Sequence, residues 1–126
     1  MTARPTITRT NIAATLAAVI GLAVVVFLVV QLNAPAIEPA HLLRYRLGGA
    51  DNQIIVTVAR GHCDPVKDAR VQEDASSVHV TVLVERTRGT CTGDIVFQEV
   101  SPTLASPLAG RAVFDSAGSP LPLETR

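Results

Sequence analysis

The chain has 126 residues, of which 11 are basic and 11 acidic, so its formal net charge at pH 7 is zero. This length allows one small domain at most. Zero net charge without a basic run argues against nucleic acid as a partner, because its binding needs clustered Lys and Arg.

Residues 12–32 form one apolar run, in which 18 of 21 side chains are apolar and none is charged. As a helix this run rises about 31 Å, which matches the hydrocarbon thickness of a bilayer. A spanning helix bonds its own backbone, whereas a buried core helix rarely runs this long without a polar face. We therefore predict a single transmembrane α-helix over residues 12–32, with the lipid bilayer as its partner.

The charges that flank the run set its expected orientation. Arg4 and Arg9 precede it with no acid among them, and the first charge after it is Glu38. The positive-inside bias then leaves residues 1–11 in the cytoplasm as a short N-terminal tail and residues 33–126 outside. The expected location is the cell (plasma) membrane, with a single pass, a cytoplasmic N-terminus and the C-terminus outside.

The same N-terminal segment has a second interpretation as a cleaved signal peptide. Ala34-Pro35-Ala36 has the small-x-small form of a cleavage site. Against this, the apolar run exceeds the about 7–15 residues of a signal-peptide core, and Pro35 would sit inside the site. An uncleaved anchor is the expectation, and cleavage after Ala36 stays open.

Ala13, Ala17 and Gly21 recur every fourth residue in the first half of the run. Small residues in such a row let two helix backbones approach closely, and close packing drives helix association in lipid. The row is a candidate helix-packing face toward another membrane protein or a second copy. Because Ala is common in this chain, the alternative is that the row is accidental.

Residues 33–41 contain two Pro and are expected to form a short extended stalk. Beyond them the hydrophobic period changes from that of a helix to two, which indicates strands. The clearest strand is 78–86, where Val78, Val80, Val82 and Val84 face one way. Further strands are expected at 42–47, 53–58, 94–100 and 111–115, with a short one at 71–74.

No window beyond residue 42 has a helical period of useful length. Residues 42–126 are therefore expected to form a small extracytoplasmic all-β domain, an antiparallel sheet or sandwich of five or six strands. In its first strand, Leu43, Tyr45 and Leu47 alternate with Leu42, Arg44 and Arg46. A domain of this size has a thin core, which favours a covalent link.

Cys63 and Cys91 are the two cysteines of the chain. An even number of cysteines in a small exported domain indicates a disulfide, because the compartment outside the membrane is oxidising. Joining them closes a loop of about 28 residues, worth roughly 3–4 kcal/mol in the chain-entropy model. Two alternatives stay open. A redox-active pair lacks CxxC spacing here, and a metal site would need more ligands than His62 and Asp64 supply.

The remaining polar residues provide no recognisable catalytic set. No nucleophile-elbow, zinc-protease, P-loop or dinucleotide-binding motif is present. Four neighbouring acids lack the order of a calcium loop, so a solvated loop is the better interpretation, and the three histidines are scattered. We therefore predict no enzyme activity, no catalytic residues, no metal site and no cofactor. The three histidines are His41, His62 and His79, and the four neighbouring acids are Asp64, Asp68, Glu73 and Asp74.

The C-terminal half carries a recognisable pattern, formed by the segments 61–65 (GHCDP), Cys91, 104–115 (LASPLAGRAVFD) and 118–120 (GSP). It resembles small, uncharacterised exported or membrane-anchored proteins of high-GC Gram-positive bacteria, the actinobacterial type. In these, two Cys are followed by a Leu-x-x-Pro-Leu-x-Gly/Asp-Arg-x-Val-x-Asp segment. The resemblance implies export, a disulfide and a bacterial origin, and it carries no assigned activity.

One position of that segment departs from the pattern, because Ala109-Gly110-Arg111 stands where the family has Gly-Asp-Arg. Pro107 is expected to set a turn before the last strand. Arg111 and Asp115 then lie on one face of that strand, four residues apart. We expect the segment to close an edge of the sheet rather than to form a binding site.

The leading hypothesis for function is a single-pass membrane protein whose external β-domain is a non-enzymatic accessory or interaction module. Its partner would be another membrane protein, reached through the helix or the β-domain. The alternative is a signal-peptide-cleaved, exported small domain that binds a small ligand or a metal. A third hypothesis, a thiol oxidoreductase, would require Cys63 or Cys91 to be reduced and reactive.

Overall fold

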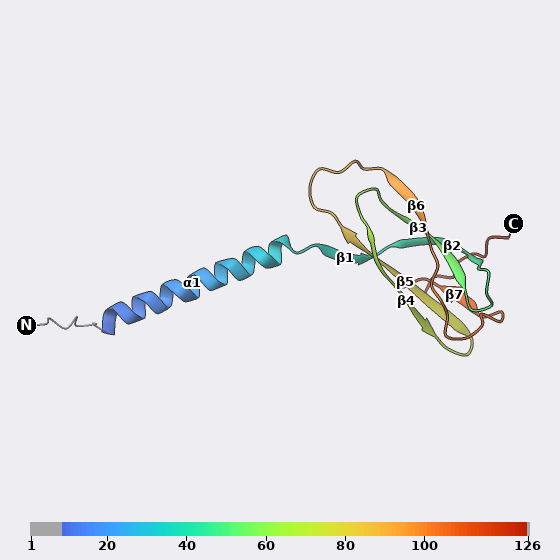
Figure 1. Cartoon of the computed structure of the whole chain (residues 1–126), viewed down its shortest axis with the longest axis horizontal. Coiled ribbons are helices and arrows are strands. Elements are labelled where there is room, and N and C mark those ends of the chain that lie inside the picture. The colour runs from blue at the N-terminus through green and yellow to red at the C-terminus, as the bar shows by residue number, and fades with distance from the viewer. Residues whose placement is uncertain (1–8, 126) are drawn as a thin grey trace, which may run out of the picture. The chain divides into compact units, whose positions relative to one another are not determined.

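The computed structural model describes residues 9–125 and divides after Ala34 into two units, which are described separately (Figure 1). The first unit contains helix α1, Arg9–Asn33. Its part from Asn11 to Asn33 is long and apolar enough to cross a membrane, and every side chain from 11 to 33 is exposed. A helix that is apolar all round is suited to lipid. Residues 1–8 of the expected cytoplasmic tail lie outside the described residues.

The second unit is a β-domain of two sheets. In one sheet the strand order is β1-β5-β4, with β7 added beside β5, and in the other it is β2-β3-β6. This confirms the expected helix followed by a small all-β domain. The strands are β1 Ala36–Pro39, β2 His41–Leu47, β3 Ile54–Gly61, β4 Val66–Glu73, β5 Ser77–Arg86, β6 Ile95–Val100 and β7 Ala112–Phe114.

The two sheets share one hydrophobic core, to which β3 and β5 contribute most. On β5 the four alternating Val side chains are all buried, as their period predicted. On β3 every second residue from Ile54 to Val58 is fully buried as well. Alternate residues of a strand point to opposite faces, so each sheet offers one apolar face to the other. The core residues are Leu42, Tyr45, Ile54, Val56, Val58, Val78, Val80, Val82, Leu104, Leu108, Val113 and Leu121.

Strand β2 differs from the alternation expected for it. Leu42 and Tyr45 are buried, whereas Leu47 is 59% exposed. The pairing with β3 shifts between Leu42 and Arg44, which marks a β-bulge. A bulge adds one residue to one strand, so Leu42 and Tyr45 both face the core although they are three residues apart. Leu47 is the last residue of the strand. The alternation of apolar and polar residues in the sequence does not reveal where the extra residue of the bulge lies.

The segment expected as a stalk is extended, but most of it belongs to the β-domain. Ala36–Pro39 pair antiparallel with the end of β5, from Ala36↔Arg86 to Pro39↔Leu83. Pro is compatible with this position because an edge strand leaves one side of its backbone unpaired. The domain boundary therefore lies at residue 35 rather than 42. Only Ala40 separates β1 from β2, and Figure 1 shows the two as one ribbon passing from sheet to sheet.

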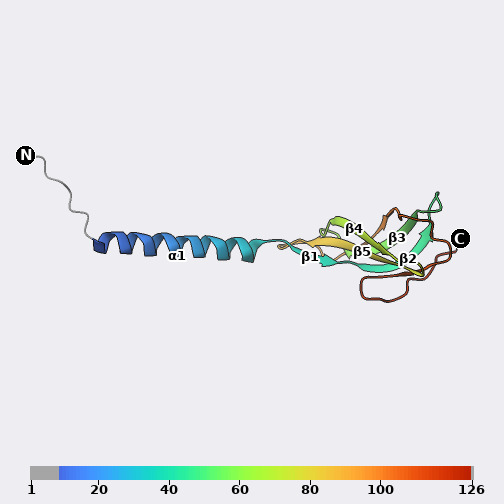
Figure 2. The same ribbon diagram turned by 90° about the horizontal axis from the view of Figure 1, so that it is seen from below.

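The end of the chain closes the domain with little regular structure. β7 pairs parallel to β5, whereas the other strand pairs are antiparallel. The Leu104 and Leu108 side chains enter the core, and their N–H groups donate to the carbonyls of Asn52 (2.7 Å) and Asp51 (3.0 Å). In Figure 2 this red C-terminal chain lies at the end of the domain away from β1. The expected edge-closing role of the segment has a structural basis in these contacts.

Candidate functional site

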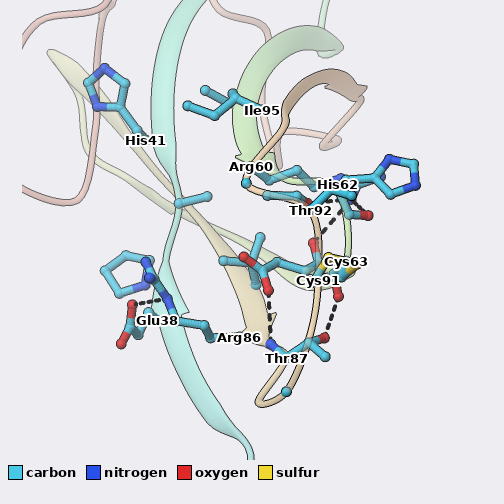
Figure 3. Close-up of a pocket in the computed structure, with 18 residues that line it drawn as sticks. Glu38, His41, Arg60, His62, Cys63, Arg86, Thr87, Cys91, Thr92 and Ile95 are labelled. Carbon is cyan, nitrogen blue, oxygen red and sulfur yellow. Dashed lines mark hydrogen bonds and ion pairs between the residues drawn. A yellow bond between two sulfur atoms is a disulfide. The ribbon is translucent and has the colours of Figure 1, made fainter.

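A pocket of about 650 Å³ lies where β1, the end of β3 and the start of β6 meet (Figure 3). The loop between β5 and β6 forms one of its walls. Cys63 and Cys91 are joined there by a disulfide, with their Cα atoms 6.2 Å apart. The bond ties the turn after β3 to the β5–β6 loop and so fixes two walls of the pocket.

Arg60 organises the turn that carries Cys63. Its Nη1 donates to the carbonyl oxygens of Gly61 (3.0 Å), His62 (3.2 Å) and Asp64 (3.2 Å). Its Nε donates to Oε1 of Gln98 on β6 at 2.6 Å. Hydrogen bonds from a charged donor are the stronger kind. The Nε and Nη1 groups of Arg60 therefore hold the turn and tie it to β6.

Asp64 and Thr87 connect the same turn to the end of β5. The Thr87 N–H donates to Oδ1 of Asp64 at 2.8 Å, and the Thr87 hydroxyl donates to the carbonyl oxygen of Cys63. Gly61 is required by this arrangement, because a Cβ at that position would collide with the Asp64 carboxylate. These contacts make the pocket wall a rigid structural turn.

On the opposite wall, Arg86 forms an ion pair with Glu38 of β1 at 3.1 Å. His41 and His62 lie on different sides of the pocket in Figure 3. His79 is elsewhere on β5, where its ring stacks on Phe114 with centroids 5.1 Å apart. Among residues 9–125, no three His, Cys, Asp or Glu side chains come together as a metal site would require.

The acidic residues Asp68, Glu73 and Asp74 each have hydrogen-bond or ion-pair partners within the β-domain. Asp68 pairs with Arg70 at 2.8 Å, and Glu73 pairs with Arg111 at 3.0 Å. The Ser77 hydroxyl and the N–H groups of Ser76 and Ser77 donate to Asp74, and these bonds hold the pKa of Asp74 far below its ordinary value. The carboxylate groups of these three acids are therefore engaged by donors of the protein itself.

The strand β6 carries a feature that the sequence analysis did not single out. Ile95 is 66% exposed and Phe97 is 69% exposed. Both lie on the outer face of their sheet, where their partners on β3 are the small residues Gly61 and Ala59. The signal was present in the segment IVFQEV, which is apolar at both alternating sets of positions and therefore cannot bury both.

The three small residues proposed as a helix-packing face lie on helix α1. Ala13, Ala17 and Gly21 lie four residues apart on α1 and are exposed. A Cβ added at Gly21 would meet no atom within 4 Å. The surface there is open to a close neighbour.

No protein-family model, curated protein or solved structure matches the chain.

Proposed function

We propose that this chain is a single-pass plasma-membrane protein that holds a disulfide-bonded β-domain outside the cytoplasm as a non-enzymatic interaction module. The observation that carries the proposal is the exposed apolar strand β6, with Ile95 and Phe97 on its outer face. Exposed aromatic and aliphatic side chains next to each other are typical of contact surfaces.

The location rests on two features of different kinds. Helix α1 has the length and the apolar surface of a membrane span. The Cys63–Cys91 disulfide requires an oxidising compartment, which lies on the outer side of a plasma membrane. Arg4 and Arg9 before the helix favour the matching orientation, with the N-terminus inside. The resemblance to exported actinobacterial proteins supports the same membrane.

The pocket beside the disulfide supports binding rather than catalysis. Arg60 and Asp64 are used by the turn itself, and Arg86 is paired with Glu38. General acid–base or nucleophilic catalysis needs a positioned pair of reactive groups. The two cysteines of the pocket lining are bonded to each other and so provide no free thiol.

The position of β1 favours an uncleaved anchor over a signal peptide. Cleavage after Ala36 would cut within β1 and remove the pair between Ala36 and Arg86. A processing site is better suited to an exposed, unpaired segment.

The proposed topology predicts a clear result from C-terminal fusions to the full chain. A reporter that is active only outside the cytoplasm should give signal, and a reporter active only inside should give none. As a control, replacing Arg4 and Arg9 by Ala and Asn33 by Lys should weaken this preference. Signal from the cytoplasmic reporter alone would contradict the proposed orientation.

A further inference from the structure

β6 is an edge strand, and it differs from the other edges of the β-domain. The edge strand β1 ends in Pro39, which has no N–H to donate. The edge strand β4 carries Lys67, Asp68 and Arg70 with exposed side chains. Charged residues and Pro on an edge prevent the addition of a further strand.

The far edge of the second sheet is covered by the chain itself. Tyr45 of β2 donates its N–H to the carbonyl of Pro122 at 3.0 Å and accepts from the N–H of Glu124 at 2.8 Å. Among the edge strands of residues 9–125, β6 is the one with neither protection between Ile95 and Gln98. That stretch contains no Pro and no charged residue.

Two hydrogen bonds, one at each end of the β3–β6 pair, show which residues of β6 direct their backbone groups toward β3. The His62 N–H donates to the carbonyl of Asp94 at 2.9 Å, and the Ile54 N–H donates to that of Pro102 at 3.5 Å. Residues of an antiparallel strand alternate in the side to which they direct N–H and C=O. The even-numbered residues therefore bond to β3, and Ile95 and Phe97 direct their backbone groups to the open edge.

From this geometry we infer that β6 pairs antiparallel with β6 of a second copy of the chain. Pairing centred on Val96 opposes Ile95 to Phe97 of the second copy, and Phe97 to Ile95 of the second copy. In both pairs the facing residues direct N–H and C=O toward each other. The three-stranded sheets of two copies then become one continuous six-stranded sheet, with two aliphatic–aromatic pairs on its outer face.

A second copy fits this edge because the edge is complementary to itself. When the pairing is centred on Val96, Glu99 of one copy lies opposite Gly93 of the other. Its carboxylate is then not opposite Ile95 or Phe97 of the second copy. A symmetric strand pair is also the usual self-contact of an open edge. The inference rests on the proposed function in one respect, since a membrane anchor raises the local concentration of copies.

The test uses the full chain in membranes with a benzophenone side chain at position 97. Irradiation should produce a covalent dimer of the chain, with the cross-link to the peptide that contains Ile95. The same side chain at position 70, on the charged edge β4, is the matched control and should give no dimer.

A second variant separates the strand from the helix. Ile95→Lys places a charge opposite Phe97 of the second copy, so the dimer yield should fall by roughly tenfold or more, because a charge in an apolar contact is strongly unfavourable. Leu47→Lys, at a similarly exposed apolar position on β2, should leave the yield unchanged. A disulfide-dependent gel shift in each variant reports that the domain is folded.

The outcomes distinguish this inference from the proposed function. A monomer, or a cross-link only to lipid or to another protein, overturns the pairing of two copies. So does a dimer that survives Ile95→Lys but is lost in Gly21→Leu, because the helix alone would then hold it. In each case the C-terminal reporters still test the membrane topology independently.

Discussion

Replacing Cys63 and Cys91 by Ser is expected to destabilise the isolated domain 35–126 by about 3–4 kcal/mol. The bond closes a loop with a sequence separation of 28, and the expected loss is the chain entropy that the unfolded state regains. Net stabilities of small domains are only about 5–15 kcal/mol. The loss is therefore a large part of the total, and urea unfolding followed by circular dichroism measures it.

Reduction provides the matched control for this prediction. Adding a reductant to the wild-type domain should lower its unfolding midpoint to that of the Cys63→Ser/Cys91→Ser variant. The same reductant should leave the variant unchanged. Equal midpoints for the oxidised wild type and the variant would show that the bond does not stabilise the domain.

Arg111→Ala is expected to cost about 3 kcal/mol, because charged hydrogen bonds in a nearly buried site are lost together. The Arg111 side chain is only 9% exposed. It pairs with Glu73 at 3.0 Å and donates to the carbonyls of Ser106 (3.0 Å), Pro107 (2.8 Å) and Leu108 (3.1 Å). One side chain thus holds the 104–111 segment against the end of β4.

Arg44→Ala is the control for the Arg111 experiment. Arg44 also forms an ion pair, with Glu124 at 3.1 Å, but both side chains are exposed. Exposed ion pairs contribute about 0–1 kcal/mol, so its unfolding free energy should change little. Equal effects of Arg44→Ala and Arg111→Ala would contradict the bracing role of Arg111.

The sequence predicts those parts of the fold that follow a simple period. The apolar run determines α1 because a membrane span depends on length and composition. The buried Val side chains of β5 follow from strict alternation. The two-cysteine count in an exported domain points to the observed Cys63–Cys91 bond.

Features that depend on distant partners are not visible in local patterns. β1 is a strand only because β5 is available to pair with Ala36–Pro39. The bulge in β2 turns both Leu42 and Tyr45, which are three residues apart, toward the core without any local sequence mark. Leu104 and Leu108 enter the core from an irregular segment, so no period identifies them.

The candidate site was predictable only in part, for the same reason. The cysteines could be named, but the pocket beside them arises from β1, β3 and β6 meeting in space. Arg60 and Arg111 look like ordinary surface cations in the sequence. Their roles depend on backbone carbonyls that the fold places around each guanidinium.

The mass of the protein extracted from membranes tests the central claim most directly. An anchored, disulfide-bonded chain should be recovered from the membrane fraction with the peptides of residues 9–36 still attached. Its non-reduced mass should be lower than its reduced mass by two hydrogen atoms. Recovery of a soluble form that begins at Ile37, or of two free thiols at Cys63 and Cys91, would contradict the account.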